Sequence, residues 1–267
     1  MAFEELKERQ SFVWGNAPYE NVADSIADVH RAVADAAGSA EGKRWLDVGC
    51  GTGGVTHLAA RRGADVVGID LAPALIATAK RLAAEKGLEI DYRVGDAENL
   101  DVEDESFDIV TSAVGVMFAP DQPRAAAELA RVMRPRSRLA LANWTPAGGI
   151  GLMFKWMAQF QPPPPESAGM PLEWGRRERV EELLGDAFDL EFEARISPFE
   201  IDSGEKYWQW FSPNFGPLKT LVDSLDDDRR EELHRAWVDF FESPPFGSPG
   251  GPVVQQREYL LVTGTRR

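Results

Sequence analysis

The sequence predicts an α/β fold in which a doubly wound, parallel β-sheet is covered by helices on both faces. Between residues 40 and 145, compact apolar runs alternate repeatedly with segments of helical periodicity. The first run enters a glycine-rich turn, LDVGCGTGG at residues 46–54, and the second run ends on Asp70. Because ligands of such sheets bind at the carboxyl ends of the strands, the turn and Asp70 predict a binding site.

Length and composition allow one large domain or two small ones, and they argue against nucleic acid as a partner. The chain has 267 residues, of which 43% are hydrophobic, and its formal net charge of −15 has the wrong sign for tracking phosphates. A single cysteine, Cys50, excludes a disulfide framework and a cysteine-based metal cluster, and fits a reducing compartment. The N-terminal stretch MAFEELKERQ lacks an apolar signal core, and no apolar run is long enough to span a bilayer. We therefore expect a cytoplasmic protein without a nucleic-acid or membrane partner.

Two helices are expected ahead of the first strand. Residues 2–14 mix charged and apolar side chains in an amphipathic pattern, which predicts a short helix that packs on the body of the protein. A second helix is expected after Pro18 and ends near Gly38. The apolar positions that predict it, at spacings of three and four, are Val22, Ile26, Val29 and Val33.

The alternation of strands and helices continues from the glycine turn to residue 144. Helices are predicted at 55–62, at 73–87 and at 119–135, and strands at 64–70, 88–94, 107–113 and 137–144. A polar, acidic loop that begins GDAENL at residues 95–100 separates the third strand from the fourth.

Past Trp144 the regular alternation is interrupted by two irregular stretches, which are predicted to be insertions. They span about 146–175 and 202–252, and the first contains the run from Pro162 to Pro165, which cannot continue a helix. Other elements expected in this part are a helix at 177–184 and strands at 188–196 and 257–267. Neither insertion is long enough to form an independent domain. Residues 1–267 are therefore predicted to be one domain, with a core at about 40–145 and two cap segments.

The glycine turn predicts a nucleotide-like ligand. Gly49, Gly51 and Gly53 occupy alternate positions, which allows the backbone to approach a ligand closely at the start of a helix. Asp47 places a carboxylate at the mouth of the turn. Read as Gly49, Gly51 and Gly54, the same turn also satisfies a dinucleotide fingerprint, so glycine spacing alone does not identify the ligand.

Taken in order, the motifs resemble those of the class I S-adenosylmethionine-dependent methyltransferases, in particular the small-molecule group called type 11 or ubiquinone/menaquinone-biosynthesis-like. The segments that carry the resemblance are LDVGCGTGG at 46–54, VVGIDLA at 66–72, GDAENL at 95–100, FDIVTSAVGVMF at 107–118 and ELARVMRPRSRLALANW at 128–144. The resemblance implies S-adenosyl-L-methionine as the cofactor. It also implies a Rossmann-like, mostly parallel sheet of about seven strands whose last strand runs antiparallel.

For the methionine end of this cofactor, the resemblance implies binding by the first and fourth strand ends. The backbone of Gly49, Gly51 and Gly53 would meet the carboxylate at the N-terminus of the following helix. Asp47 would counter the ammonium, directly or through water, and the backbone of Ala113 would bind the same amine.

For the adenosine end, the resemblance implies two carboxylates. Asp70, followed by Leu71, would accept hydrogen bonds from both ribose hydroxyls, because an ionised carboxylate has two acceptor oxygens. Asp96 would accept from the adenine amino group while the Ala97 N–H donates to the ring.

No catalytic side chain and no metal site is predicted. Methyl transfer from a sulfonium is an in-line displacement on an activated electrophile, so a general base matters only when the acceptor must lose a proton. The histidines that could act as this base are His30, His57 and His234, and each is expected to be an ordinary surface residue.

The aromatic residues of the two caps predict a small, largely apolar acceptor bound under a lid, with Trp144 at its hinge. Trp14 and Tyr19 are expected to cover the cofactor, as the corresponding segment does in similar enzymes. The alternative without a binding role is that these aromatic side chains only pack the caps onto the sheet.

Two other functions remain open at this stage. An NAD(P)-dependent oxidoreductase would share the glycine turn, although Asp47, the GDAENL loop and the absence of a Tyr-x-x-x-Lys pair oppose it. A non-catalytic protein that binds S-adenosylmethionine or S-adenosylhomocysteine also fits, because the chemistry requires no obligatory side chain. The acceptor atom and the oligomeric state are open as well.

Overall fold

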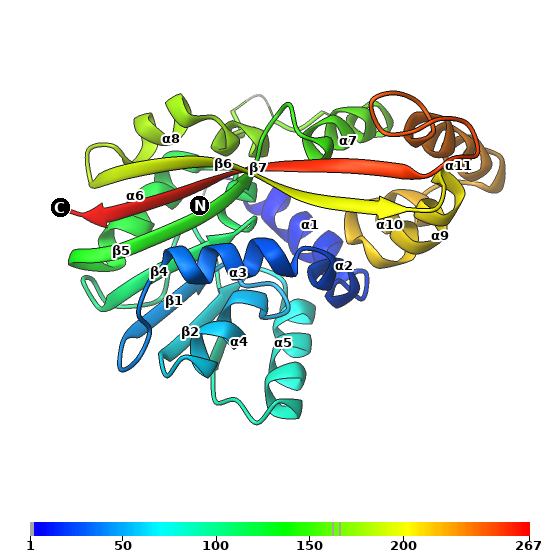
Figure 1. Cartoon of the computed structure of the whole chain (residues 1–267). Helices are drawn as coiled ribbons and strands as arrows, with labels where there is room; N and C mark the ends of the chain where they lie inside the picture. The colour runs from blue at the N-terminus through cyan, green and yellow to red at the C-terminus, as the bar shows by residue number, and fades with distance from the viewer. Residues whose placement is uncertain (1–2, 162, 166) are drawn as a thin grey trace.

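Seven strands form one sheet through the centre of the computed structural model (Figure 1). They are β1 (Arg44–Val48), β2 (Asp65–Asp70), β3 (Asp91–Val94), β4 (Phe107–Ala113), β5 (Met133–Trp144), β6 (Phe188–Ile201) and β7 (Val253–Arg266). Their order is β3-β2-β1-β4-β5-β7-β6. The pairs among β1 to β5 are parallel, and β7 runs antiparallel to both of its neighbours. The predicted fold class is confirmed, including the direction of the last strand.

The structure describes residues 3–161, 163–165 and 167–267. Pro162, the first residue of the proline run, and Glu166 therefore lie outside the described residues, as do the first two residues of the chain. None of the helices in the described part is long and apolar enough to cross a membrane.

Helices pack on the sheet, and several of them gather at one end of it (Figure 1). They are α1 (Glu4–Gly15), α2 (Glu20–Ser25), α3 (Ala27–Ala36), α4 (Gly54–Arg61), α5 (Pro73–Glu85), α6 (Gln122–Val132), α7 (Gly149–Met157), α8 (Arg177–Leu184), α9 (Gly204–Asn214), α10 (Gly216–Asp223) and α11 (Asp227–Phe241), with short 3₁₀ turns η1 (Val116–Phe118), η2 (Ala158–Phe160) and η3 (Pro171–Gly175). Helix α3 packs on α4 and crosses β4 and β5, whereas α6 packs on α8. Figure 1 shows α7, α9, α10 and α11 gathered around the far ends of β6 and β7.

The single helix expected between Pro18 and Gly38 is in fact two helices, so that prediction was wrong. The chain breaks at Ile26, whose φ of −117° is not helical. The break leaves α2 free to pack on α9 while α3 packs on the sheet. It also frees the carbonyl of Ser25, which accepts a hydrogen bond of 2.6 Å from Nη2 of Arg257 in β7.

The second insertion is regular rather than irregular, because 202–252 contains the three helices α9, α10 and α11. These helices pack where β6 and β7 pair with each other beyond the rest of the sheet. Both strands are 14 residues long, and β6 continues past the predicted end at residue 196. The helix predicted at 119–135 ends at Val132, and the strand predicted to begin at residue 137 begins at Met133.

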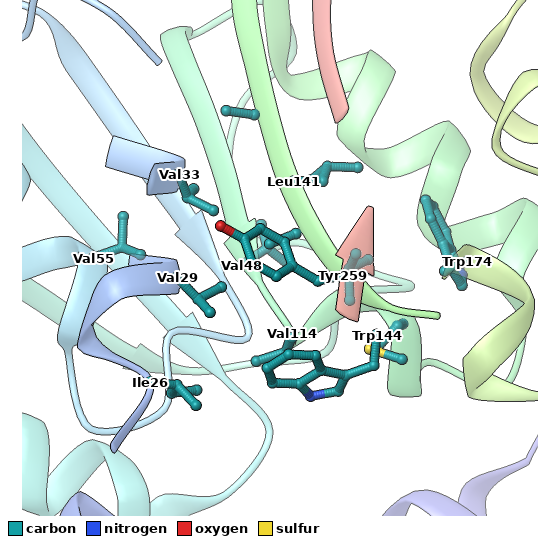
Figure 2. Packing of buried hydrophobic residues seen from close by; sticks show 14 of the residues in the cluster. Ile26, Val29, Val33, Val48, Val55, Val114, Leu141, Trp144, Trp174 and Tyr259 are labelled. Atoms are coloured by element: carbon teal, nitrogen blue, oxygen red, sulfur yellow. The ribbon is translucent and has the colours of Figure 1, made fainter. Parts of the chain in front are cut away.

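One hydrophobic core runs from the sheet into the caps. Val29 and Val33 of α3 lie on one side of the central strands, and Trp174 lies on the other side (Figure 2). Trp174 belongs to the first cap and Trp237 to the second, and neither side chain has any exposed surface. The caps therefore share the buried core of the sheet.

Candidate active site

The glycine turn after β1 is held in a conformation that favours glycine. Gly49, Gly51 and Gly53 have φ values of +66°, +54° and +96°. A Cβ on Gly49 would lie 2.7 Å from the Cα of Gly115, so the β1 loop and the β4 loop touch through backbone alone. Helix α4 starts directly after this turn. The unpaired N–H groups and the positive dipole end of the helix therefore lie at the turn.

Asp70, at the end of β2, ties two loops together. Its Oδ2 accepts a hydrogen bond of 2.8 Å from the Gly51 N–H, and its Oδ1 accepts one of 2.9 Å from the Ala72 N–H. Burial raises the pKa of this carboxyl, and the backbone hydrogen bonds partly offset that shift. Each oxygen keeps lone-pair capacity for a further donor.

The acidic loop after β3 is joined to the N-terminal helix. Lys7 of α1 has only 5% of its surface exposed, and its Nζ lies 2.7 Å from Oδ2 of Asp96 and also contacts Glu98. The other oxygen of Asp96 accepts from the Glu98 N–H. The three charged groups form a compact, buried network that fixes α1 over the loop.

A pocket of about 900 Å³ opens between these loops. Among the residues predicted from the sequence to bind a cofactor, seven line it, namely Gly49, Gly51, Asp70, Leu71, Asp96, Ala97 and Ala113. This volume includes space that is open to solvent. The sequence motifs are therefore brought together at a single cavity.

Asp47 and Gly53 are not among the residues that line this pocket. Asp47 is 2% exposed and accepts a hydrogen bond of 2.7 Å from Oγ1 of Thr111 in β4. Burial raises the pKa of its carboxyl to about 7. Gly53 lies at the start of α4, against the side chains of Tyr92 and His57.

The sequence interpretation expected Trp14 of α1 to cover the cofactor but missed Lys7 and Gln10 of the same helix. Lys7, Gln10 and Trp14 all line the pocket. Their spacing of three and four residues places them on one face of the helix, and this signal was present in the sequence. Tyr19 also lines the pocket, as expected for a residue that covers the cofactor.

The expectation of surface histidines was wrong for two positions. His57 is 6% exposed, and its Nδ1 lies 3.1 Å from Nζ of Lys86. His30 is half-buried and lines the pocket. Burial lowers the pKa of both imidazoles to about 4, so both are neutral at physiological pH. His234 remains partly exposed and pairs with Glu205 at 2.8 Å.

A second, smaller cavity, which we call the chamber, adjoins the pocket, and its empty volume of about 470 Å³ includes space open to solvent. The two cavities share a wall made by Trp14, Tyr19, Val114 and Phe118. The rest of the chamber is mostly aromatic and aliphatic, with contributions from both caps and from Trp144 at the end of β5. The side chains of the chamber that carry a hydroxyl or a charge are Tyr19, Ser25, Tyr207 and Arg257. A ligand in this chamber would therefore lie next to a ligand in the pocket, with these shared residues at their boundary.

Residues 46–141 of the chain match the methyltransferase domain family. The uncharacterized protein Rv1405c of Mycobacterium tuberculosis is 34% identical over 262 residues, which cover 96% of this chain and 93% of the relative. The demethylmenaquinone methyltransferase of Thermus thermophilus is 39% identical over 117 residues, or 42% of this chain and 53% of that enzyme.

Among solved structures, the YcgJ protein of Bacillus subtilis superposes with a TM-score of 0.62. The likeness covers 90% of this chain and 98% of that protein at 20% identity, so it shows a shared fold. The sequence match and the fold agree on the segment that contains the glycine turn and the carboxyl ends of β1, β2 and β4.

Proposed function

Because the chain belongs to the class I S-adenosylmethionine-dependent methyltransferases, we propose that it methylates a small, largely apolar molecule in the chamber next to its cofactor pocket. The observation that carries this proposal is the shared wall between the two cavities. Methyl transfer needs direct contact between donor and acceptor, so Trp14, Tyr19, Val114 and Phe118 would border the opening through which the two ligands meet.

The residues of the pocket fit S-adenosyl-L-methionine. The N-terminus of α4 offers its positive dipole end to the methionine carboxylate, whereas the N–H groups of the three turn glycines already donate to acceptors within the protein. Lone pairs on Asp70 remain available for the ribose hydroxyls, and the loop at Asp96 and Ala97 would flank the adenine. When bound, the cofactor supplies a methyl group that is already activated on a sulfonium.

In this assignment, Ala113 contributes backbone near the methionine amine, and Leu71 lies beside the ribose. Asp47 would act on the ammonium of the cofactor through water rather than by direct contact, since it does not line the cavity. Gly53 acts by starting α4 with its N–H groups aimed at the pocket.

The protein's contribution to the reaction is mainly positioning and exclusion of water. Aromatic side chains from the caps, among them Phe154, Trp210 and Phe215, enclose the chamber. No histidine, carboxylate, lysine or cysteine is among the described residues that line it. A small apolar acceptor also agrees with the name of the Thermus relative, which denotes a quinone methyltransferase. We assign residues 1–267 to one domain, in which the two caps and the N-terminal helices together supply most of the acceptor chamber.

The test is a calorimetric titration of the full chain with S-adenosylhomocysteine and, separately, with NADH. We expect S-adenosylhomocysteine to bind with micromolar affinity, about −8 kcal/mol, and NADH not to bind. Transfer of labelled methyl groups to a panel of apolar aromatic compounds then separates an enzyme from a protein that only binds the cofactor. Preference for NADH, or no binding of either, would contradict the proposal.

A further inference from the structure

Arg257 is a buried cation in an otherwise apolar chamber. It lies in β7, has 4% of its surface exposed and lines the chamber proposed to hold the acceptor. No Asp or Glu is among the described residues that line the same space. A guanidinium stays protonated at physiological pH even where burial lowers its pKa, as it does here.

The partners of this guanidinium are neutral. Its Nε donates to the Ser197 carbonyl at 3.1 Å, and its Nη1 donates to Oγ of Ser25 at 3.1 Å. Its Nη2 donates to the Ser25 carbonyl at 2.6 Å and to Oγ of Ser197 at 2.9 Å. These bonds orient the group and use most of its N–H donors, whereas the ion pairs of the described residues do not include it.

The groups around Arg257 do not cancel its charge within the chamber. Burial lowers the pKa of Arg257, and the charge of Asp28, an exposed residue outside the chamber, partly offsets this shift. Asp28 accepts a hydrogen bond of 2.9 Å from Oγ of Ser197. Tyr19 and Tyr207 line the same space, and burial raises the pKa of both phenols, so they remain neutral. Phe199 stacks under the guanidinium at 5.0 Å from the ring centroid, which adds no charge.

We propose that the acceptor carries one anionic oxygen group, a carboxylate or an ionised hydroxyl, which binds to Arg257 while its apolar body fills the aromatic chamber. This inference rests on the proposed function and names the class of its acceptor. An unpaired charge in an apolar site is stabilised strongly by an opposite charge, and a charged hydrogen bond is about twice as strong as a neutral one. An acceptor hydroxyl that binds in its ionised form needs no general base. This agrees with the absence of histidine, carboxylate, lysine and cysteine among the described residues that line the chamber.

The test compares matched probes on the full chain saturated with S-adenosylhomocysteine. The carboxylate arm uses 2-naphthoate against 2-naphthamide. The hydroxyl arm uses a 2-naphthol made acidic by electron-withdrawing substituents against its methyl ether. Binding is measured by calorimetry in wild type, in Arg257→Met and in Arg257→Lys. The control variant is Arg195→Met, because Arg195 lies in the neighbouring strand β6, pairs with Glu193 and does not line the chamber.

In wild type, we expect at least one anion to bind about tenfold or more tightly than its neutral partner. Arg257→Met should abolish this ratio, Arg257→Lys should keep part of it, and Arg195→Met should leave it unchanged. Which arm shows the preference identifies the carboxylate or the hydroxyl.

A wild-type ratio near one in both arms, or no binding of any probe, overturns the inference whether or not the Arg257 variants fold. A purely structural role for Arg257 would lower stability without changing this ratio. Binding of S-adenosylhomocysteine in the same samples is a separate readout, because its loss in wild type would contradict the proposed function instead.

Discussion

At the scale of single residues, the carboxylate of Asp70 has two roles, one in holding the loops and one proposed in binding the ribose. It accepts hydrogen bonds from the Gly51 and Ala72 N–H groups, and we assign its remaining lone pairs to the ribose. Asp70→Ala should weaken binding of S-adenosylhomocysteine by about tenfold or more, because a charged hydrogen bond contributes ~1.5–3 kcal/mol. Calorimetry on the folded variant measures this loss.

Asp70→Asn keeps one acceptor oxygen and should show an intermediate affinity. The matched control is Asp65→Ala, at the exposed start of the same strand, which should bind as wild type does. Wild-type affinity in Asp70→Ala would mean that the ribose binds elsewhere.

Asp47 predicts a pH dependence of stability. Its pKa is about 7 in the folded protein and about 3.8 for the unperturbed group, because burial disfavours the charged form. Between these values the folded state holds a proton that the unfolded state has lost. Raising the pH through this window therefore lowers the free energy of unfolding, by up to about 1.4 kcal/mol per pH unit.

The comparison with Asp47→Asn isolates this effect. The low pKa values of His30 and His57 act in the opposite sense, since these groups gain protons on unfolding below pH 6.5. The difference in free energy of unfolding, wild type minus Asp47→Asn, should fall as the pH rises from about 5 to 7. Denaturant titrations at several pH values measure it, and a constant difference would show that Asp47 is already ionised when folded.

At the scale of elements, α1 depends on Lys7. Its Nζ neutralises Asp96 and Glu98 in a site where all three side chains are largely buried. Lys7→Met would leave two carboxylates without a cation, which should destabilise the fold by about 3 kcal/mol. It should also weaken binding of S-adenosylhomocysteine, because α1 carries Gln10 and Trp14 into the pocket.

Thermal unfolding and calorimetry test both expected effects of Lys7→Met. Arg9→Met is the control, since Arg9 is an exposed residue of the same helix and should change neither quantity. Loss of stability with unchanged affinity would restrict α1 to the packing role that the sequence suggested.

Elements with strong local signals were predicted well, and those that depend on distant partners were not. Strand β4 and helix α8 have their predicted bounds, because an apolar run and a 3.6-residue period are local properties. The extension of β6 to Ile201 was missed because its partner is β7, more than fifty residues later in the chain. The break at Ile26 was missed because the apolar period continues through it while Arg257 captures the freed carbonyl.

At the scale of the whole molecule, we expect the caps and the sheet to unfold together. Strand β7 pairs with β5 over its second half and continues beyond it, paired with β6, into the caps. Trp174 and Trp237 belong to the same core cluster as Leu141 of β5. Equilibrium unfolding followed by tryptophan fluorescence and by far-ultraviolet circular dichroism should therefore give one coincident transition. Two separate transitions would show that the caps form an independent unit.

The sequence by itself determined the fold class, the cofactor family and the loops that form the pocket. Its signals were the order of the motifs, the glycine turn and the carboxylate at the end of the second strand, which can be read from short segments of the chain. The tertiary structure alone decided that Lys7 meets Asp96 and that His57 is buried. It alone decided the position of Arg257, whose partners Ser25 and Ser197 lie 232 and 60 residues away in the chain. Burial and charge pairing arise only when distant segments pack together, and no local pattern encodes them.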